Sequence, residues 1–412
     1  MKNFVAHTDS IREEMLKSVS CGTVEDLFKQ IPVKFNNFDL ANPLSELETQ
    51  KKLKALAKNN NIDKVSFLGG GVYNKFVPAC VPYMAQRFEF LTAYTPYQPE
   101  ISQGTLQIIY EYQTMISRLT GMDIANASMY DGGSACAEAI LMAHRIARGK
   151  KNKALVSNTL SPEYKDVVKT YCWAEGIELE WFDMLPNDCE SYCAVVIQNP
   201  DYYGEISEVV KPNTTLIVVA NLSALSILKP PYEADIVVGD IQPLGITVSF
   251  GGPHAGFMAC KETYMRQLPG RLVGKTVDAD GKTAYTLTIQ TREQHIKREK
   301  ATSNICSNQS LIALSATLYL SLLGENGFRQ TGLISANLAH SLADKLVKKG
   351  YVVENKNFFN EFVVKVKDAD VFLKNLSDKN IIGGLKLDNT RVLVCATEMN
   401  TEEEIEKYIS IV

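Results

Sequence analysis

A loop that is rich in hydrogen-bonding side chains is the first candidate site. Residues 93–104 read AYTPYQPEISQG, and the two prolines and the glycine argue against a regular helix or strand. The loop presents five polar side chains that could bind a ligand, namely Tyr94, Tyr97, Gln98, Glu100 and Gln103. A loop whose tyrosines only pack against the protein explains these residues equally well, so both interpretations stay open at this point.

Two glycine-rich turns are weaker candidates. Residues 129–134, MYDGGS, predict a strand end, a turn and a helix start, and the N-terminus of a helix can bind phosphate. The turn lacks the lysine of a P-loop and the third glycine of a dinucleotide site, which favours an ordinary tight turn. Residues 250–256, FGGPHAG, contain His254, which could act as an acid or a base; for a lone histidine, a structural role is the better hypothesis.

A basic stretch near residue 300 is the fourth candidate. Arg292 and His295 precede a small polar turn formed by Thr302, Ser303 and Asn304. Arginine is suited to the recognition of carboxylate or phosphate groups. Acidic residues interrupt the stretch, however, so the sequence favours a solvated helical face and keeps a site role as the alternative.

The elements that must position these residues alternate along the chain. Helical spacing of apolar residues predicts helices at 105–119 and 134–147. Short strands are predicted at 127–130, 154–157, 177–182, 194–198, 216–220 and 235–238. Leu216–Ala220 is apolar throughout, as expected for a parallel strand that is covered on both faces. The alternation predicts an α/β domain with a mostly parallel sheet.

The remaining segments suggest three parts. Residues 1–60 read as a helical arm, with capping boxes that begin at Ser10 and Ser45, and residues 61–325 as the large α/β domain. The large domain includes a strand pair at 246–250 and 256–260 and a buried helix at 308–323 that ends at Gly324. Residues 326–412 read as a small α+β domain, with helices at 335–349, 371–375 and 402–411 and strands at 351–354, 362–367 and 392–396.

Composition narrows the class of protein. The 412 residues are 45% hydrophobic and 22% charged with a net charge of −4, so the basic surface of a nucleic-acid-binding protein is not expected. Nine cysteines without a CxxC pair suggest reduced thiols in a cytoplasmic protein. No metal-ligand spacing is present among the five histidines. The longest apolar stretch, 311–323, is shorter than the roughly 18 residues that span a membrane.

The motifs together resemble the glycine decarboxylase family, the P-protein of the glycine cleavage system. The stretches that carry the resemblance are YTPYQPEISQG (94–104), YQTMISRLTGMDIANASMYDGG (112–133), FGGPHAGF (250–257), LPGRLVG (268–274) and QTREQHIKREKATSNIC (290–306). Length and motifs look like subunit 1, the α subunit of the split bacterial form. The resemblance implies a fold-type I pyridoxal-phosphate (PLP) fold, similar to aspartate aminotransferase, with a large domain and a small C-terminal domain.

The resemblance also implies how this chain departs from a PLP enzyme. By motif register Val218 stands where the family's catalytic half has the aspartate that pairs with the pyridine nitrogen, and Pro243 stands at the Schiff-base lysine. The side chains of valine and proline offer no group for either role. PLP is therefore expected on a partner β subunit. The implied partners are that subunit in an α2β2 complex and the lipoyl H protein, with the T and L proteins indirectly; no nucleic acid or membrane is expected.

Within such a complex the chain would help to decarboxylate glycine and transfer its aminomethyl group to the lipoyl group. Tyr94 and Tyr97 are then expected to act in the partner's active site, where their hydroxyls could orient the substrate or move a proton. Further residues are expected to contact substrate: Gln98, Glu100, Arg292, His295, Thr302, Ser303 and Asn304. Two alternatives remain, namely a self-sufficient PLP enzyme that uses an off-register lysine such as Lys229 or Lys261, and a purely structural subunit.

Overall fold

The computed structural model describes residues 6–32, 40–60, 62–91, 94–305 and 308–412. The proline-rich loop at 93–104 is here called the tyrosine loop. Its first residue, Ala93, and the last residue of the basic stretch, Cys306, lie outside these ranges. The chain divides into two compact units, Met1–Ile62 and Asp63–Val412. Each unit is described by itself.

The first unit contains two α-helices. Helix α1 (Asp9–Ser18) begins at the N-cap Thr8, not in a capping box at Ser10 as predicted, because the Thr8 hydroxyl accepts the bond from the Ile11 backbone. A 3-10 turn, η1, spans Glu25–Phe28. Helix α2 (Glu46–Ala57) has the predicted capping box, in which Ser45 and Glu48 each accept a backbone N–H. Among the described residues of this unit, Leu16 is the one buried apolar side chain, so the described part of the unit has no core of its own.

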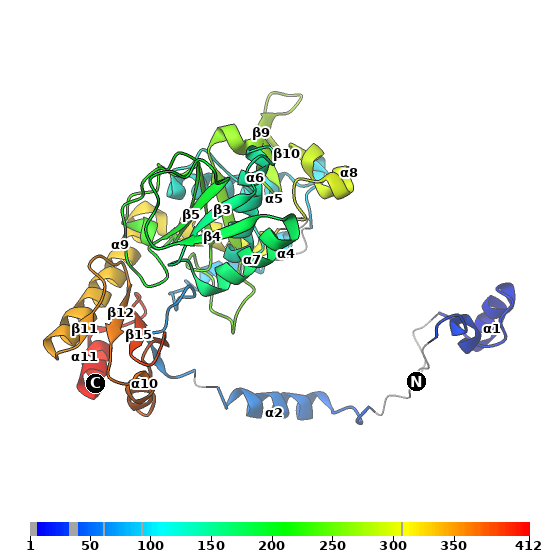
Figure 1. The fold of residues 1–412 in the computed structure, drawn as a ribbon. Helices are drawn as coiled ribbons and strands as arrows, with labels where there is room; N and C mark the ends of the chain where they lie inside the picture. Colours follow the sequence, from blue (N-terminus) through cyan, green and yellow to red (C-terminus); the bar gives the residue numbers. More distant parts are fainter. Residues whose placement is uncertain (1–5, 33–39, 61, 92–93, 306–307) are drawn as a thin grey trace. The chain divides into compact units, whose positions relative to one another are not determined.

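A mostly parallel sheet forms the centre of the second unit (Figure 1). Its strands, as far as the chain is described, run in the order β2, β8, β7, β6, β5, β3, β4, and β8 alone is antiparallel to its neighbours. In chain order they are β2 (Ile124–Ala125), β3 (Lys153–Ser157), β4 (Glu178–Phe182), β5 (Ala194–Asn199), β6 (Thr215–Ala220), β7 (Ile236–Asp240) and β8 (Gly256–Cys260).

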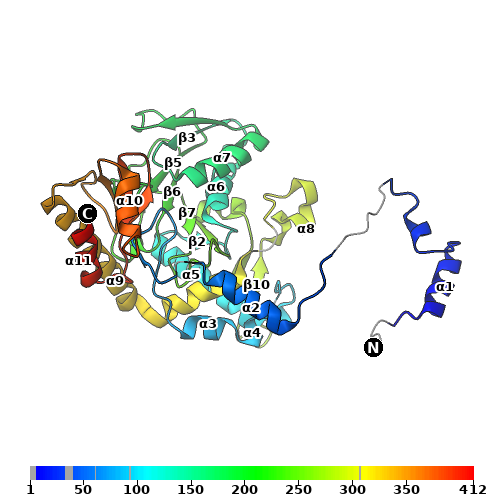
Figure 2. The ribbon, with the colours of Figure 1, turned by 90° about the horizontal axis from the view of Figure 1, so that it is seen from below.

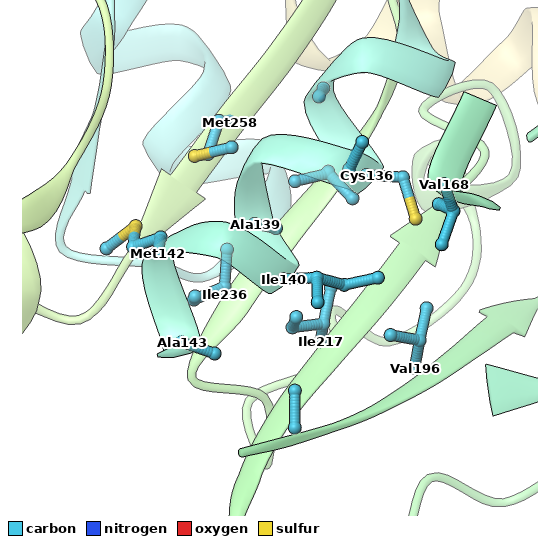
Figure 3. Packing of buried hydrophobic residues seen from close by; sticks show 14 of the residues in the cluster. Cys136, Ala139, Ile140, Met142, Ala143, Val168, Val196, Ile217, Ile236 and Met258 are labelled. Carbon is cyan, nitrogen blue, oxygen red and sulfur yellow. The ribbon is translucent and has the colours of Figure 1, made fainter. Parts of the chain in front are cut away.

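Helices cover both faces of this sheet. Helices α6 (Gly132–Ile146) and α7 (Pro162–Glu175) pack on one face, where Ile140, Val196 and Ile217 lie in one apolar cluster (Figure 3). Helix α5 (Gln103–Thr120) and the first half of α9 pack on the other face with Leu155, Val195 and Val218. Alternate residues of the same strand thus enter different cores, which explains why the strands are apolar throughout.

Helix α9 (Ser310–Lys348) joins the large α/β part to the C-terminal part (Figure 2). It packs against α3 (Cys80–Ala85) and α5 at one end and α11 (Glu402–Ile411) at the other. By length and composition α9 is apolar enough to cross a membrane, but Gly324 interrupts its helical backbone and its buried residues belong to the packed cores. It is therefore interpreted as a core helix.

The C-terminal part is built on an antiparallel sheet of four described strands. These are β11 (Val352–Val353), β12 (Glu361–Lys365), β15 (Arg391–Cys395) and β14 (Leu385–Lys386), in that spatial order. Helices α10 (Ala369–Ser377) and α11 complete the part. Residues 65–76, here called the linking segment, also belong to it, because β1 (Val65–Ser66) pairs with β13 (Ile381–Ile382) and Phe67 lies in the same core.

The structure confirms most predicted elements and corrects three. The predicted strand 127–130 is not formed; β2 ends at Ala125, and Met129 makes an isolated bridge to Gly256. The predicted strand 246–250 is a turn, since Ser249 and Phe250 have positive φ and their side chains are exposed. The two helices predicted at 308–323 and 335–349 are one kinked helix, α9.

One hairpin has no counterpart in the sequence prediction. Strands β9 (Leu272–Val277) and β10 (Thr283–Thr288) form it, and it packs against α5. Short helical turns follow at η5 (Gln290–Arg292), α8 (Gln294–Lys297) and η6 (Arg298–Lys300). The remaining short helices are α4 (Phe88–Leu91), η2 (Pro99–Ile101), η3 (Ala224–Ser226) and η4 (Glu262–Gln267).

Candidate functional site

Hydrogen bonds to the hairpin of β9 and β10 fix the tyrosine loop. The Gln103 side-chain amide accepts the Tyr285 N–H at 2.9 Å and donates to the Tyr285 carbonyl at 2.9 Å. It also donates to the Pro99 carbonyl at 2.8 Å, within the loop itself. Pro96 is buried, and the backbone N–H of Tyr97 donates to the Thr95 carbonyl. The loop is therefore held in one conformation by side-chain and backbone bonds in addition to its two prolines.

Tyr97 contacts two basic side chains. The Arg271 Nη2 donates to the Tyr97 hydroxyl at 3.2 Å, and the guanidinium carbon lies 5.4 Å from the ring centre. The His295 ring meets the Tyr97 ring edge-on with 5.5 Å between the centres. Tyr97 is 43% exposed, so part of its side chain remains accessible from outside the chain. The structure thus brings Tyr97 and His295 together, two of the predicted site residues.

The other predicted residues of the loop point outward. Tyr94 is 81% exposed, and Gln98 and Glu100 are exposed as well. Exposed polar side chains beside a fixed tyrosine suit contact with a second macromolecule better than a closed pocket within this chain.

The basic stretch differs from the predicted solvated helix. Arg292 is 7% exposed and donates from Nη1 to the Leu268 carbonyl, and burial lowers its pKa. Glu293 beside it is also buried; burial raises the pKa of Glu293, while Arg271 and Arg292 oppose that shift. The Oε2 of Glu293 lies 3.6 Å from the Nδ1 of His295. Arg292 therefore faces the interior, and Glu293 connects it to the Tyr97 side.

The small polar turn of Thr302, Ser303 and Asn304 contacts the backbone of Arg292. The Thr302 N–H donates to the Arg292 carbonyl at 3.0 Å, and the Ser303 hydroxyl donates to Glu138 at 2.8 Å. Burial raises the pKa of Glu138, and the serine hydrogen bond lowers it in part. Asn304 is exposed. Thr302 and Ser303 therefore hold buried groups in place, while Asn304 remains available to a partner.

A separate cavity of about 260 Å³ lies at the carboxyl ends of the sheet strands. Pro243 lines it, and Val219, Ala220 and Asn221 come from the end of β6. Val218 does not line it and packs in the core of the α5 face instead. The other lining residues are Gly70, Gly71, Val72, Tyr73, Ser161, Glu163, Tyr164, Gln198, Tyr202 and Asp240.

The residues around this cavity do not fit PLP. No lysine or arginine is among the described lining residues, so neither a Schiff base nor a cation for the phosphate is provided. The N-terminus of α6 is filled by the chain's own carboxylates, because Asp131 accepts the Ser134 N–H at 2.7 Å and Asp240 accepts the Gly132 N–H at 3.3 Å. Burial raises the pKa of Asp240 to about 6.

Tyr164 closes the same helix end sterically. A Cβ built on Gly132 would lie 1.7 Å from the Tyr164 hydroxyl, so this ring lies directly against the turn. The two off-register lysines are engaged elsewhere: Lys229 pairs with Glu233, and Lys261 pairs with Asp235 at 3.0 Å. Neither is among the residues that line the cavity. Over the described part of the chain, no group of three or more His, Cys, Asp or Glu side chains could hold a metal ion.

Arg271 and Asn308 were missed by the sequence analysis. Arg271 lies inside the quoted stretch LPGRLVG but has no spacing signal, and it is 3% exposed. Asn308 accepts from Arg271 Nη1 at 3.4 Å. A lone arginine between a glycine and two apolar residues was the available signal, because a buried charge requires nearby partners.

The whole chain matches a known family. The family model of the glycine cleavage system P-protein matches residues 2–412. A curated relative from Desulforamulus reducens, a probable glycine dehydrogenase (decarboxylating) subunit 1, is 46% identical over 98% of this chain and 97% of its own length.

Solved structures agree with the family match. A crystal structure of glycine decarboxylase (P-protein) of the glycine cleavage system, in inhibitor-bound form, has a TM-score of 0.90 and 41% identity, with 99% of each chain covered. A variant of the C-DES enzyme with glycine covalently linked to its PLP cofactor has a TM-score of 0.59 at 13% identity, over 85% of this chain and 96% of the other. At that identity the likeness concerns the fold alone, which is the fold of type I PLP enzymes.

Proposed function

The chain belongs to the glycine cleavage system P-protein family, and we propose that it is the subunit that holds no cofactor and completes its partner's active site. Its activity is that of glycine dehydrogenase (decarboxylating), exercised within a complex. PLP takes part in that activity, and in this proposal it is bound by the β subunit.

The observation that carries the proposal is the contrast between the two candidate regions. The described residues that line the cavity at Pro243 include no lysine or arginine, and its helix end is closed by Asp131 and Tyr164. The tyrosine loop, in contrast, is fixed by hydrogen bonds, and Tyr97 in it stays 43% exposed. A preorganised hydroxyl at the surface is useful only if a second chain supplies the reacting groups.

The roles of the individual residues follow from their placement. Tyr94 and Tyr97 would enter the partner's active site, with Gln98, Glu100 and His295 beside them. Asn304 would contact substrate or the partner, while Arg292, Thr302 and Ser303 support the site from within. The proposed assembly is α2β2 in the cytoplasm, and it delivers the aminomethyl group to the lipoyl H protein.

The domain division belongs to the same proposal. Residues 61–325 would form the large domain with the tyrosine loop and the closed cavity, except that the linking segment packs with the small domain formed by residues 326–412. Residues 1–60 would pack on another subunit, since the described part of this arm has no core of its own.

Reconstitution tests the proposal. The chain, the β subunit and their mixture are each assayed for exchange of the glycine carboxyl group with labelled bicarbonate. We expect exchange from the mixture and none from this chain alone. Exchange by the isolated chain would refute the proposal in favour of a self-sufficient enzyme. Full exchange by a complex with Tyr94→Ala and Tyr97→Ala would instead make the chain a purely structural partner.

A further inference from the structure

Arg271 is a buried cation whose side chain ends beneath the tyrosine loop. It follows Gly270, which has a φ of +75°, at the start of β9. Its carbonyl accepts the Ala127 N–H at 2.9 Å, so its backbone is fixed to the segment beside β2. Arg271 is 3% exposed, and burying a guanidinium costs free energy unless the group is hydrogen-bonded or paired with an opposite charge.

Asn308 accepts a hydrogen bond from this guanidinium. Its Oδ1 accepts from Arg271 Nη1 at 3.4 Å, and its Nδ2 donates to the Ala127 carbonyl at 3.0 Å. The other end of the fork, Nη2, then reaches the Tyr97 hydroxyl at 3.2 Å. The planar fork of arginine can serve both partners at once, which the single ammonium of lysine cannot do with the same geometry.

The direction of the hydrogen bond determines what Tyr97 can do. A guanidinium only donates, so the Tyr97 oxygen must be the acceptor. The hydroxyl proton of Tyr97 therefore cannot be used toward Arg271 and is free for an acceptor elsewhere. Because Tyr97 is 43% exposed and His295 contacts its ring, a second chain can reach the part of the side chain that stays exposed.

We propose that Arg271 is a positioning residue, which holds Tyr97 so that its hydroxyl donates a hydrogen bond into the active site of the partner subunit. This inference rests on the proposed function. Arg271 itself does not touch the substrate, and its effect passes through Tyr97. Glu293 is also buried, and the attraction of Arg271 opposes the rise of its pKa that burial causes.

A double-mutant cycle in the reconstituted complex tests this role. The variants are Arg271→Gln, Tyr97→Phe and both together, and the readouts are kcat and KM for glycine in the exchange assay. We expect Arg271→Gln to lower kcat by roughly tenfold to a hundredfold, because misplacing a group by about 1 Å can cost about 10²-fold. KM should change by less than about threefold, since uniform substrate binding is not removed.

The decisive comparison is in the Tyr97→Phe background. There Arg271→Gln should have no further effect on kcat, because the hydroxyl that it positions is already gone. Arg271→Lys should restore part of the loss, since one donor remains. The control is Arg391→Gln. It removes a guanidinium of the C-terminal part that lies 5.7 Å from the ring of Tyr203, and it should leave kcat unchanged.

The outcomes separate this inference from the proposed function. Full activity of Tyr97→Phe would refute the role of the loop itself. A large loss with Tyr97→Phe, combined with an Arg271→Gln effect that is equal in both backgrounds, would refute only the positioning role. If Arg271→Gln fails to assemble, Asn308→Ala replaces it, because it releases the fork without removing the charge. A loss of kcat with Asn308→Ala that persists in the Tyr97→Phe background would also overturn the inference.

Discussion

Tyr97 is fixed by the hydrogen bond from Arg271 to its hydroxyl and still remains partly exposed. Tyr97→Phe keeps the ring contacts with Arg271 and His295 but removes the hydroxyl. Turnover by the complex is expected to fall by roughly 10²–10³-fold, the usual loss for one preorganised donor. The melting temperature should hardly change, because the packing remains.

Tyr203→Phe is the matched control for this substitution. Tyr203 is also a tyrosine with an arginine over its ring, but it lies in contact with Arg391 of the C-terminal part. It should leave turnover unaffected. Equal activity of Tyr97→Phe and Tyr203→Phe in the exchange assay would show that the Tyr97 hydroxyl has no role in turnover and that the loop only packs against its neighbours.

At the scale of elements, the linking segment depends on one buried carboxyl group. Glu361 of β12 accepts from the Gly70 N–H and from the Tyr73 hydroxyl at 2.8 Å. Burial raises its pKa from 4.5 to about 7, an effect that the Gly70 and Tyr73 bonds oppose and Asp201 reinforces. Between these two pKa values the folded chain keeps a proton that the unfolded chain has released. The resulting stabilisation is complete below the unfolded pKa and is lost as the pH rises through about 7.

Glu361→Gln should remove this dependence on pH. Between pH 5 and pH 8 the free energy of unfolding of the natural chain should fall relative to the variant, by at most about 3 kcal/mol. Urea unfolding at the two pH values measures the difference. The exposed residue Glu325 of α9 provides the control Glu325→Gln. Parallel pH curves for the natural chain and Glu361→Gln would show that this proton does not contribute.

Elements with a strong period were predictable from sequence, and those set by tertiary contacts were not. Helix α11 was predicted with its exact ends, and the structure shows that Thr401 and Glu404 form a capping box at its start. The strand predicted at 246–250 failed because apolar residues there remain exposed in a turn, with Phe250 90% exposed. The hairpin β9–β10 was missed because its outer half is polar and its partner is α5.

The candidate site shows the same limit. The tyrosine loop was identifiable from composition, because prolines and polar side chains cluster there. Arg271 was not identifiable as a site residue, since it is a single arginine with no spacing signal. Only the packing shows that Arg292 turns inward to Leu268 while Arg271 reaches Tyr97.

At the scale of the whole molecule, exposed apolar side chains near the loop indicate an interface. Ile101 of η2 is 80% exposed, and Phe88 and Tyr94 are exposed as well. If the loop enters the partner subunit, Ile101 becomes buried on assembly. Ile101→Glu should then weaken binding to the β subunit by roughly thirtyfold, the equivalent of about 2 kcal/mol for a central contact.

The control for that prediction is a substitution at the opposite edge of the sheet. Met184, just after β4 on the opposite edge from β2, is 86% exposed, and Met184→Glu should leave binding unchanged. Light scattering with titration of the β subunit measures both variants. Equal affinity of Ile101→Glu and the natural chain would place the interface elsewhere.

The position of the cofactor in the assembled complex tests the division of labour most directly. The complex is loaded with PLP, reduced with borohydride and digested, and the phosphopyridoxyl label is located by mass spectrometry. We expect the label on one lysine of the β subunit and none on this chain, because Pro243 stands at the Schiff-base position and no lysine is among the described residues that line the cavity. A stoichiometric label on any lysine of this chain would contradict that division.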